Sequence, residues 1–517
     1  MNAPLPLVGP IVLPLVVAGL LLAVPRRLTL HRIGWLGTGV AVLAQGGMLL
    51  AATRRGEVLT ERIGGWPAGF AITLAADTFS ALMVTVVALV VLLCGVFAIG
   101  SGDDRRPYLV PLALMTSAGA FGAFLTADLF NLFVLIEVML VPSYVLLTAG
   151  AGRERTVAGR IYVTVNLLAS TILLAGVGLV YSVAGTVDLG ELAGSASRDG
   201  ALALAGTVVL LALAVKAAVV PLHGWLPRSY PYAPPVVTAL FSGVLTKVGG
   251  YAIVRIVAVV YDGAVDYRWV IGLAAAVTMV IGVLGALGET TMRSVLAFHM
   301  VSQIGYLLIG LAVFNPAALT AAIFFLVQYI LVKAALFLCA GAVVVGYGTD
   351  KLDRLGGLAT VHRLLALAFI GAGLSLAGMP PFSGFLAKFL LLRAAVANGD
   401  YLLFAVAVLV SLGTLISMIK IWDLAFWGEP TPAPVDHGGR PSASVNPAGQ
   451  PSVSANSAAR TDDVPPRMHT WLTGPAVLLA ALTLLLGPAA QPLLGLAATA
   501  ADGLIDPSAY VEAVTGR

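Results

Sequence analysis

Seven basic side chains and one carboxylate lie inside long apolar segments, where an unpaired charge costs at least about 2.5–3.5 kcal/mol on insertion scales. Ionisable groups in a membrane segment need a polar or hydrated interior, and they are typical of proton and ion pathways. These residues are therefore the first candidates for chemistry, and that chemistry is proton transfer. They are Glu137, Lys216, Lys247, Arg255, Lys333, Lys388, Arg393 and Lys420.

The basic residues fall into two groups. Snorkelling, in which a long side chain extends to the membrane surface, explains Arg393 and is also our interpretation of Arg255 and Lys420, which lie nearer to segment ends. Each of the other four has apolar helix or a predicted helix break on both sides. We therefore predict that these central lysines line a shared hydrated track: Lys216, Lys247, Lys333 and Lys388.

Glu137 is the only acidic residue that the sequence places deep in an apolar segment. An ion pair with a lysine of a neighbouring segment is the least costly arrangement for a buried carboxylate, and we predict Lys216 as the partner. Because burial and pairing act in opposite directions on the proton affinity of an amine, making or breaking this pair would move a proton on or off Lys216. Such a pair can act as a proton switch.

Four further residues are candidates for a proton relay. His299 and Gln303 are four residues apart and share a helix face, as do Tyr329 and Lys333. His223 follows Pro221 and could guard the cytoplasmic end of its segment. A buried structural hydrogen bond explains His299 equally well, and a loop position explains His223 equally well.

The composition places the whole chain in a membrane. Of 517 residues, 59% are hydrophobic and 10% are charged, and the mean hydropathy is +0.98, which excludes an ordinary soluble globule. The net charge of +4 is spread over short loops, so nucleic-acid binding is not expected. The sequence contains no P-loop, dinucleotide fingerprint, metal-ligand spacing or nucleophile constellation. We expect no cofactor, and the sequence identifies no metal site.

We predict an all-α polytopic membrane protein with about fourteen spans. The N-terminus lacks the features of a signal peptide, so its apolar run is expected to stay as the first span. With both termini outside, sixteen of the twenty-two loop arginines and lysines lie in the cytoplasm, as the positive-inside rule requires. The predicted spans are 4–24, 33–52, 74–99, 108–126, 128–149, 158–182, 201–221, 236–260, 269–288, 295–314, 317–346, 362–397, 401–427 and 470–495.

Prolines predict two broken helices, because proline removes a backbone donor. Pro221 ends the seventh span early, and Pro380 and Pro381 interrupt the twelfth. Spans 4–8 and 9–13 then form two five-helix repeats of opposite topology, a design typical of transporters. Residues 53–72 are expected to form an external hairpin or ordered loop. The predicted domains are 1–107 (helices 1–3), 108–260 and 261–427 (the repeats), 428–468 (a flexible cytoplasmic linker) and 469–517 (the last helix and tail).

Five stretches carry a resemblance to a known family. They are DLFNLFVLIE at 128–137 followed by Pro142, Ser143 and Tyr144; KAAVVPLHGWLP at 216–227; Lys247; SVLAFHMVSQIGY at 294–306; and PPFSGFLAKF at 380–389. The chain resembles, over essentially its whole length, the antiporter-like family shared by multisubunit Mrp-type cation/proton antiporters and the membrane arm of respiratory complex I. The first and fourth stretches are most similar to the D-subunit branch of the Mrp antiporters.

The resemblance implies fourteen helices, with the seventh and twelfth broken, and a role for each buried charge. Glu137 matches the fifth-span carboxylate and Lys216 its seventh-span partner. Lys247 matches the eighth-span connector, Lys333 the eleventh-span lysine and Lys388 the terminal twelfth-span lysine of a water-linked proton relay. The resemblance also implies other subunits of a hetero-oligomeric complex, membrane lipids, H⁺ and Na⁺ or another monovalent cation as partners, and a bacterial plasma membrane as location.

Two features depart from the family pattern. Many relatives carry histidine one turn before the eleventh-span lysine, where this chain has Gln328 and Tyr329. A tyrosine, with a reference pKa near 10, is a poorer protonatable station than histidine, and we hypothesise that His299 substitutes. The long C-terminal extension of the largest subunit type is also absent from this sequence, so that type is disfavoured.

Three functions are therefore open. The first is a subunit that exchanges cytoplasmic sodium or another monovalent cation for external protons. The second is a proton-pumping subunit of a complex I-like NADH:quinone oxidoreductase or membrane hydrogenase. The third is a scaffold subunit with a vestigial channel, which the retention of Glu137 and all four central lysines argues against. No carboxylate cluster marks a sodium path, so a partner subunit could supply it.

Overall fold

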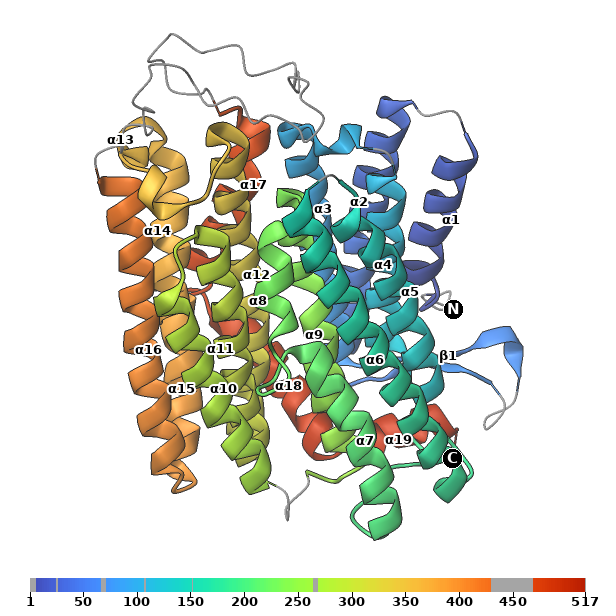
Figure 1. Ribbon diagram of the computed structural model, residues 1–517. Helices are drawn as coiled ribbons and strands as arrows, with labels where there is room; N and C mark the ends of the chain where they lie inside the picture. Colours follow the sequence, from blue (N-terminus) through green and yellow to red (C-terminus); the bar gives the residue numbers. More distant parts are fainter. Residues whose placement is uncertain are drawn as a thin grey trace, which may run out of the picture.

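The structure is a computed structural model, and it describes residues 6–24, 27–66, 71–106, 108–150, 152–263, 268–428 and 468–516. Long helices run side by side across one bundle (Figure 1). Ten of the described helices are long and apolar enough to span a membrane. They are α2 (Leu28–Thr53), α3 (Thr78–Ser101), α5 (Leu129–Thr148), α6 (Arg153–Ala184), α7 (Gly200–Ala217), α9 (Pro235–Val259), α10 (Arg268–Gly288), α11 (Met292–Val313), α12 (Pro316–Tyr347) and α16 (Tyr401–Ile421).

Shorter elements complete the bundle. Four of them are apolar helices of 10–17 residues: α1 (Gly9–Ala23), α4 (Leu109–Leu125), α14 (Arg363–Ala377) and α17 (Thr470–Leu485). Each of the fourteen predicted spans overlaps one of these long or shorter apolar helices, with bounds that differ by several residues. The remaining helices are α8 (Trp225–Ser229), α13 (Leu358–Val361), α15 (Ser383–Ala397), α18 (Gln491–Ile505) and α19 (Ser508–Thr515), with 3₁₀ turns η1 (Ile63–Gly65), η2 (Asp103–Arg105), η3 (Tyr230–Tyr232) and η5 (Leu352–Arg354) and a π-helical turn η6 (Trp422–Trp427).

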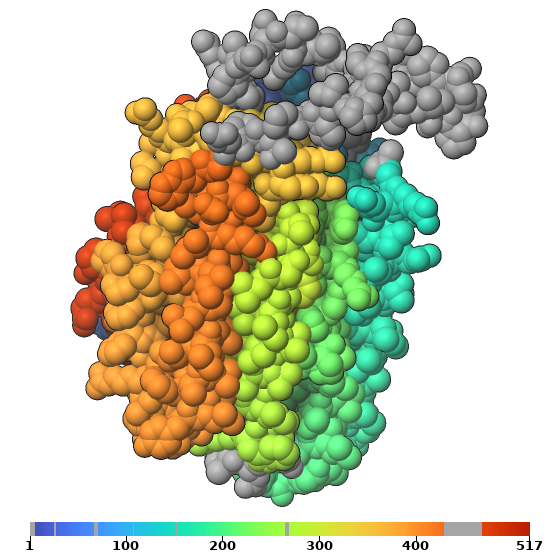
Figure 2. All heavy atoms as spheres, turned by 60° about the vertical axis from the view of Figure 1, so that its left-hand side comes forward, coloured from blue at the N-terminus to red at the C-terminus, as the bar shows by residue number. Residues whose placement is uncertain are grey.

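The centre of the bundle is formed by α9 and α12, whose most apolar stretches are entirely buried. Helices α1–α6 lie on one side of this centre, and α10, α11 and α14–α16 lie on the other (Figure 1). Figure 2 shows one flank as a continuous wall that runs from α16 in orange through α10 in yellow-green to α6 in teal. Ionisable groups on α9 and α12 are therefore shielded from lipid by the surrounding helices.

Both predicted helix breaks are present. Helix α7 ends at Ala217, four residues before Pro221, and α8 resumes at Trp225. Helix α14 ends at Ala377, and α15 begins at Ser383 after Pro380 and Pro381. Ala218 and Gly378 stand just past the two ends with positive φ, and the N–H of each donates to two carbonyls of the preceding turn. Each break thus ends the helix with a left-handed residue whose N–H stays hydrogen-bonded.

Two parts of the predicted fold need correction. The protein is not purely helical, because strands β1 (Leu59–Arg62) and β2 (Thr73–Ala76) pair antiparallel, and the second strand extends past the predicted loop 53–72. The predicted span 470–495 is also wrong at its end. Helix α17 stops at Leu485 and α18 begins at Gln491, because Gly487, Pro488 and Pro492 break the helical pattern. The predicted linker lies almost entirely outside the described residues.

Candidate functional site

A buried serine connects Glu137 and Lys216. The Ser170 hydroxyl on α6 donates a hydrogen bond to Glu137 Oε1 on α5. Lys216 Nζ, in the last turn of α7, donates to Ser170 Oγ at 2.6 Å and to the Asn166 carbonyl at 3.1 Å. The prediction of a direct Glu137–Lys216 ion pair is therefore wrong, because Ser170 lies between the two charged groups. The predicted partners are nevertheless brought together, and one hydroxyl joins them.

The two α6 residues in this cluster were missed by the sequence analysis. Asn166 and Ser170 are four residues apart and both are buried, so they share one face of α6. The signal that could have identified them is a pair of polar residues at helical spacing within the apolar middle part of α6. A serine can accept a proton while it donates its own, so this arrangement links carboxylate and amine through a hydroxyl that can reverse its direction.

The end of α7 is held against α9 close to the next central lysine. A side chain at Gly249 would approach the Ala217 backbone nitrogen to 2.8 Å, so only glycine permits this contact. Two residues earlier, Lys247 is fully buried and donates from Nζ to the Ser242 carbonyl and to Thr246 Oγ1. Backbone packing thus fixes the position of the break after α7 relative to Lys247.

A column of three aromatic rings runs between two of the central lysines. Lys247 Nζ lies 4.0 Å from the centre of the Tyr329 ring, and Lys388 Nζ lies 4.4 Å from that of the Tyr306 ring. Phe325 stacks between the two tyrosines, with centroid distances of 5.6 and 5.9 Å. Cation–π contacts stabilise a buried ammonium group without a carboxylate. The sequence analysis found Tyr329 but missed Tyr306 and Phe325.

Lys333 stands on α12 one turn beyond Tyr329. Its Nζ donates to the Leu296 carbonyl of α11 at 3.0 Å, and it lies within electrostatic range of Lys247 and Lys388. The Tyr329 hydroxyl instead donates to the Met300 carbonyl at 2.9 Å. The predicted Tyr329–Lys333 pair therefore shares a helix but sends its two polar ends to different carbonyls of α11.

The predicted relay residues on α11 and at the first break have separate surroundings. His299 Nε2 is hydrogen-bonded to Ser417 Oγ of α16 at 2.5 Å, and the charges of Lys333, Lys388 and Lys420 act on it. Among the described residues, His299 Nδ1 and Gln303 Nε2 are buried without a partner. His223 lies half-buried between α7 and α8, and its Nδ1 is likewise without a partner there.

Lys388 is the last of the four central lysines, and it lies beside the second helix break. Its Nζ donates to the Ala377 carbonyl and to Ser411 Oγ, each at 3.3 Å. A cavity of about 190 Å³ with mainly apolar walls lies beside it, and exposed residues such as Phe389 and Leu412 border this cavity. Lys388 therefore lies beside a cavity that is bordered by residues on the outside of this chain.

The interpretation of Arg255 as a snorkelling side chain is wrong. Arg255 is 3% exposed, and its guanidinium binds Asp77 through two hydrogen bonds of 2.6 and 2.8 Å. Asp77 caps α3, where it accepts from the Ser80 N–H, and Tyr510 of α19 covers the guanidinium at 4.8 Å. The prediction that Glu137 is the only deep acidic residue is thus wrong: Asp77 is buried, whereas Glu137 is half-buried. Asp77 was missed because it caps a helix at the edge of its apolar segment.

The other two snorkelling candidates differ. Arg393 is exposed, as predicted. Lys420 is half-buried, and its Nζ donates to the carbonyls of Leu287 and Glu289 at 2.8 and 2.6 Å. These carbonyls close the C-terminal end of α10, where a cation is favourable. Lys420 therefore stabilises the end of α10, and this contact, in place of snorkelling, explains its position.

The aromatic column makes a specific prediction for Tyr329. Replacement by phenylalanine keeps the ring over Lys247, whereas replacement by alanine removes it and leaves a cavity. We expect Tyr329→Ala to reduce transport by about tenfold or more, since a desolvated cation–π contact contributes about 2 kcal/mol. Tyr329→Phe is expected to retain most of the wild-type rate.

The measurement is proton-coupled exchange in vesicles, normalised to assembled complex. Equal losses in both variants would show that the hydroxyl matters and the ring does not. Equal retention in both would remove the aromatic column from the transport path.

Known proteins share this architecture. The family model for the transmembrane part of NADH:quinone oxidoreductase and Mrp antiporter subunits matches residues 126–416. The Na⁺/H⁺ antiporter D-subunit of Alkalihalophilus pseudofirmus is 36% identical, with 98% of each chain covered. A chain in the structure of the Mrp complex from a Dietzia species is 46% identical, with both chains fully covered and a TM-score of 0.93.

A third similarity concerns the fold alone. A chain of the membrane-bound sulfane sulfur reductase, an archaeal respiratory membrane complex, has a TM-score of 0.84 at 22% identity, with 98% of this chain and all of that chain covered. The shared architecture thus occurs in an Mrp complex and in an archaeal respiratory membrane complex.

A helical membrane bundle with two broken helices and a row of buried lysines defines the class of antiporter-like membrane subunits. The chain belongs to the NADH:quinone oxidoreductase/Mrp antiporter family of membrane subunits. The predicted resemblance to the D-subunit branch is confirmed, and so is the prediction of a transporter subunit in place of a catalytic enzyme.

Proposed function

We propose that this protein is the proton-translocating subunit of a multisubunit monovalent cation/proton antiporter, with Na⁺ as the expected cation. Protons would move along a buried relay, and the observation that carries the proposal is the Glu137–Ser170–Lys216 chain of hydrogen bonds. Breaking and re-forming the Lys216 contact would load and unload its amine. The remaining stations are Lys247, Lys333 and Lys388, with His299, His223, Tyr329 and Gln303 as water-linked intermediates.

The proposed topology has fourteen spans in a bacterial plasma membrane, with both termini outside. Spans four to eight and nine to thirteen would form the inverted repeats. Contacts at the two ends of the chain support the orientation. The Leu7 N–H, just before α1, donates to Glu61 Oε2 in the hairpin at 2.6 Å, and Gly516, just after α19, lies against Arg62. Both termini therefore lie on the side of the hairpin.

The cation path and the partners are part of the same proposal. Among the described residues, no group of three histidines, cysteines or carboxylates is placed to hold a metal ion. We therefore assign the cation path to another chain of a hetero-oligomeric complex. The relay of this subunit would supply the proton half of the exchange.

The second candidate is a proton-pumping membrane subunit of a complex I-like or hydrogenase-type assembly. The observation that favours it is the fold shared with an archaeal respiratory membrane complex. In that case the same residues would move protons outward, driven by a redox partner.

The test uses inverted vesicles from antiporter-deficient cells that carry the whole gene cluster. A pH-sensitive dye reports proton movement after respiration has acidified the lumen. Release of the proton gradient on addition of sodium, at a level absent from vesicles without the cluster, is the expected result. Redox-driven acidification that depends on the cluster, without any sodium response, would favour the second candidate and overturn the first.

A further inference from the structure

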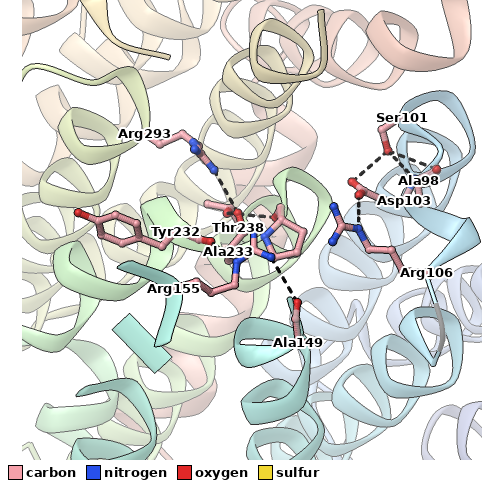
Figure 3. Close-up of polar contacts among 11 residues, drawn as sticks. Ala98, Ser101, Asp103, Arg106, Ala149, Arg155, Tyr232, Ala233, Thr238 and Arg293 are labelled. Carbon is pink, nitrogen blue, oxygen red and sulfur yellow. Dashed lines mark hydrogen bonds and ion pairs between the residues drawn. The ribbon is translucent and has the colours of Figure 1, made fainter. Parts of the chain in front are cut away.

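Three arginines from different helices meet at one end of the bundle, around the loop that leads into α9. Arg155 Nε, at the start of α6, donates to the Tyr232 carbonyl at 3.0 Å, and Arg293 Nη1, at the start of α11, donates to the Ala233 carbonyl at 3.1 Å. Figure 3 shows these two side chains reaching the 232–233 backbone and Arg106 pointing toward the same group. The charges of Arg106 and Arg293 both act on Arg155.

The charges of this cluster are incompletely balanced. Arg106 pairs with Asp103 at 2.7 Å and Arg293 with Asp350 at 2.9 Å. Within the described ranges, Arg155 is in no ion pair and donates to the carbonyls of Tyr232 and Ala149, although the Asp103 carboxylate that pairs with Arg106 also acts on its charge. The N-terminus of α6, three residues from Arg155 at Gly152, lacks a side-chain cap. Its free N–H groups add partial positive charge, which the exposed Glu154 of the first turn offsets in part.

The position of Arg155 is fixed by the backbone beside it. Gly150 has a φ of +139°, and a side chain there would lie 2.0 Å from Arg155 Nη1. Glycine is therefore required for the guanidinium to lie under this turn. Arg155 is half-buried and the Arg106 side chain is 44% exposed. The three arginines are therefore partly buried but still accessible to a ligand.

Apolar side chains continue the site toward the membrane. Val145 of α5, Val157 of α6 and Tyr232 are each at least 40% exposed, and their segments carry the contacts of Arg155. A ligand with an anionic head and apolar chains would meet arginine at one end and this apolar face at the other. Guanidinium groups bind phosphate oxygens through paired hydrogen bonds.

We propose that Arg106, Arg155 and Arg293 form a binding site for the phosphate group of an anionic phospholipid in the cytoplasmic leaflet. The proposal rests on the orientation given under the proposed function, which puts this end in the cytoplasm. Basic pockets between membrane helices on that side are suited to anionic headgroups. Because Arg155 and Arg293 hold the loop before α9, a bound lipid would also steady the helix that carries Lys247.

The test is lipid retention by the whole purified complex, measured by native mass spectrometry after detergent exchange into phosphatidylglycerol. We expect Arg106→Gln/Arg155→Gln to lower retention by about 25-fold, a factor of roughly five for each charge removed near an anionic surface. Arg54→Gln is the matched control, because Arg54 is exposed at the end of α2 next to the hairpin. Arg106→Lys/Arg155→Lys keeps the charge and should retain intermediate amounts.

Two further arms identify the source of the phosphate. Phosphatidylcholine should be retained weakly, and inorganic phosphate should not displace phosphatidylglycerol. Displacement by millimolar inorganic phosphate would assign the site to a free anion and overturn the lipid proposal. So would equal retention in all variants, or cross-links that place an acidic segment of a partner subunit over Arg155. Intact mass reports assembly in each sample, and the proposed exchange activity is measured separately, so the two proposals can fail independently.

Discussion

Replacing Lys216 by alanine is expected to abolish sodium-dependent proton exchange while leaving the complex assembled. The Lys216 amine is the donor in the hydrogen-bonded chain that ends at Glu137 Oε1, and alanine offers no site for the proton. Positioned proton-transfer groups contribute about 10²–10⁴-fold to a rate, so we expect a loss of about a hundredfold or more. The measurement is the sodium-dependent dye response in inverted vesicles, per unit of assembled complex.

The neighbouring residues provide graded comparisons. Glu137→Gln keeps the shape of the side chain but removes its charge, and it should match Lys216→Ala. Ser170→Ala removes only the bridging hydroxyl, so water can take its place and a smaller loss is expected. Arg393→Ala is the control. Like Lys216, Arg393 is a basic residue inside a predicted span, but its side chain is exposed. Wild-type exchange in Lys216→Ala would contradict the relay and revive the scaffold interpretation.

The helical bundle could be predicted because membrane helices are determined by local sequence. Apolar length sets each span, and the backbone satisfies its own hydrogen bonds within it. Pro221 and the Pro380–Pro381 pair marked the breaks for the same reason. The separate helix α18 was missed because Gly487 and Pro488 interrupt an apolar run that hydropathy alone treats as continuous. A hairpin or ordered loop was predicted at 53–72, but its two strands are four residues each, too short for a period-2 pattern to give their bounds.

The candidate site was predictable to a lesser extent. Lysine in an apolar run is visible from the sequence, and all four central lysines are indeed buried. Which atoms they contact depends on the rotation and depth of neighbouring helices, and small shifts decide whether Ser170 or Glu137 meets Lys216. The aromatic column also requires tertiary structure, because Tyr306 comes from α11 while Phe325 and Tyr329 come from α12.

The two halves of the row therefore differ in their chemistry. Hydroxyl and carboxylate groups surround Lys216, and a proton can pass among them by exchange of hydrogen bonds. Lys247 and Lys388 each contact one hydroxyl, of Thr246 and Ser411, but their other contacts are aromatic rings and backbone carbonyls, which do not accept a proton readily. We infer that transfer between these lysines depends on water near Lys333 and His299, where buried polar atoms are left open.

The second large effect is expected at the ion pair between Asp77 and Arg255. Both side chains are buried, and removing one partner leaves an uncompensated charge, which costs about 3–5 kcal/mol. We expect Asp77→Asn to lower the thermal midpoint of the purified complex strongly and to reduce its yield. Asp103→Asn is the comparison, because Asp103 is also buried but its partner Arg106 is exposed. Water can solvate the guanidinium that is left unpaired, so we expect a loss of about 1 kcal/mol, near the upper end for exposed pairs.

The double variant Asp77→Asn/Arg255→Met separates a structural role from a role in transport. Removing both charges avoids the unpaired guanidinium, and replacing a buried pair by apolar groups is often neutral, so the midpoint should recover most of the loss. If stability returns and exchange returns with it, the pair only fastens α3 to α9 beneath α19. If stability returns while exchange stays low, the charges themselves belong to the transport path, because Arg255 lies two turns from Lys247 on the same helix. An unchanged midpoint in Asp77→Asn would contradict the burial of the pair.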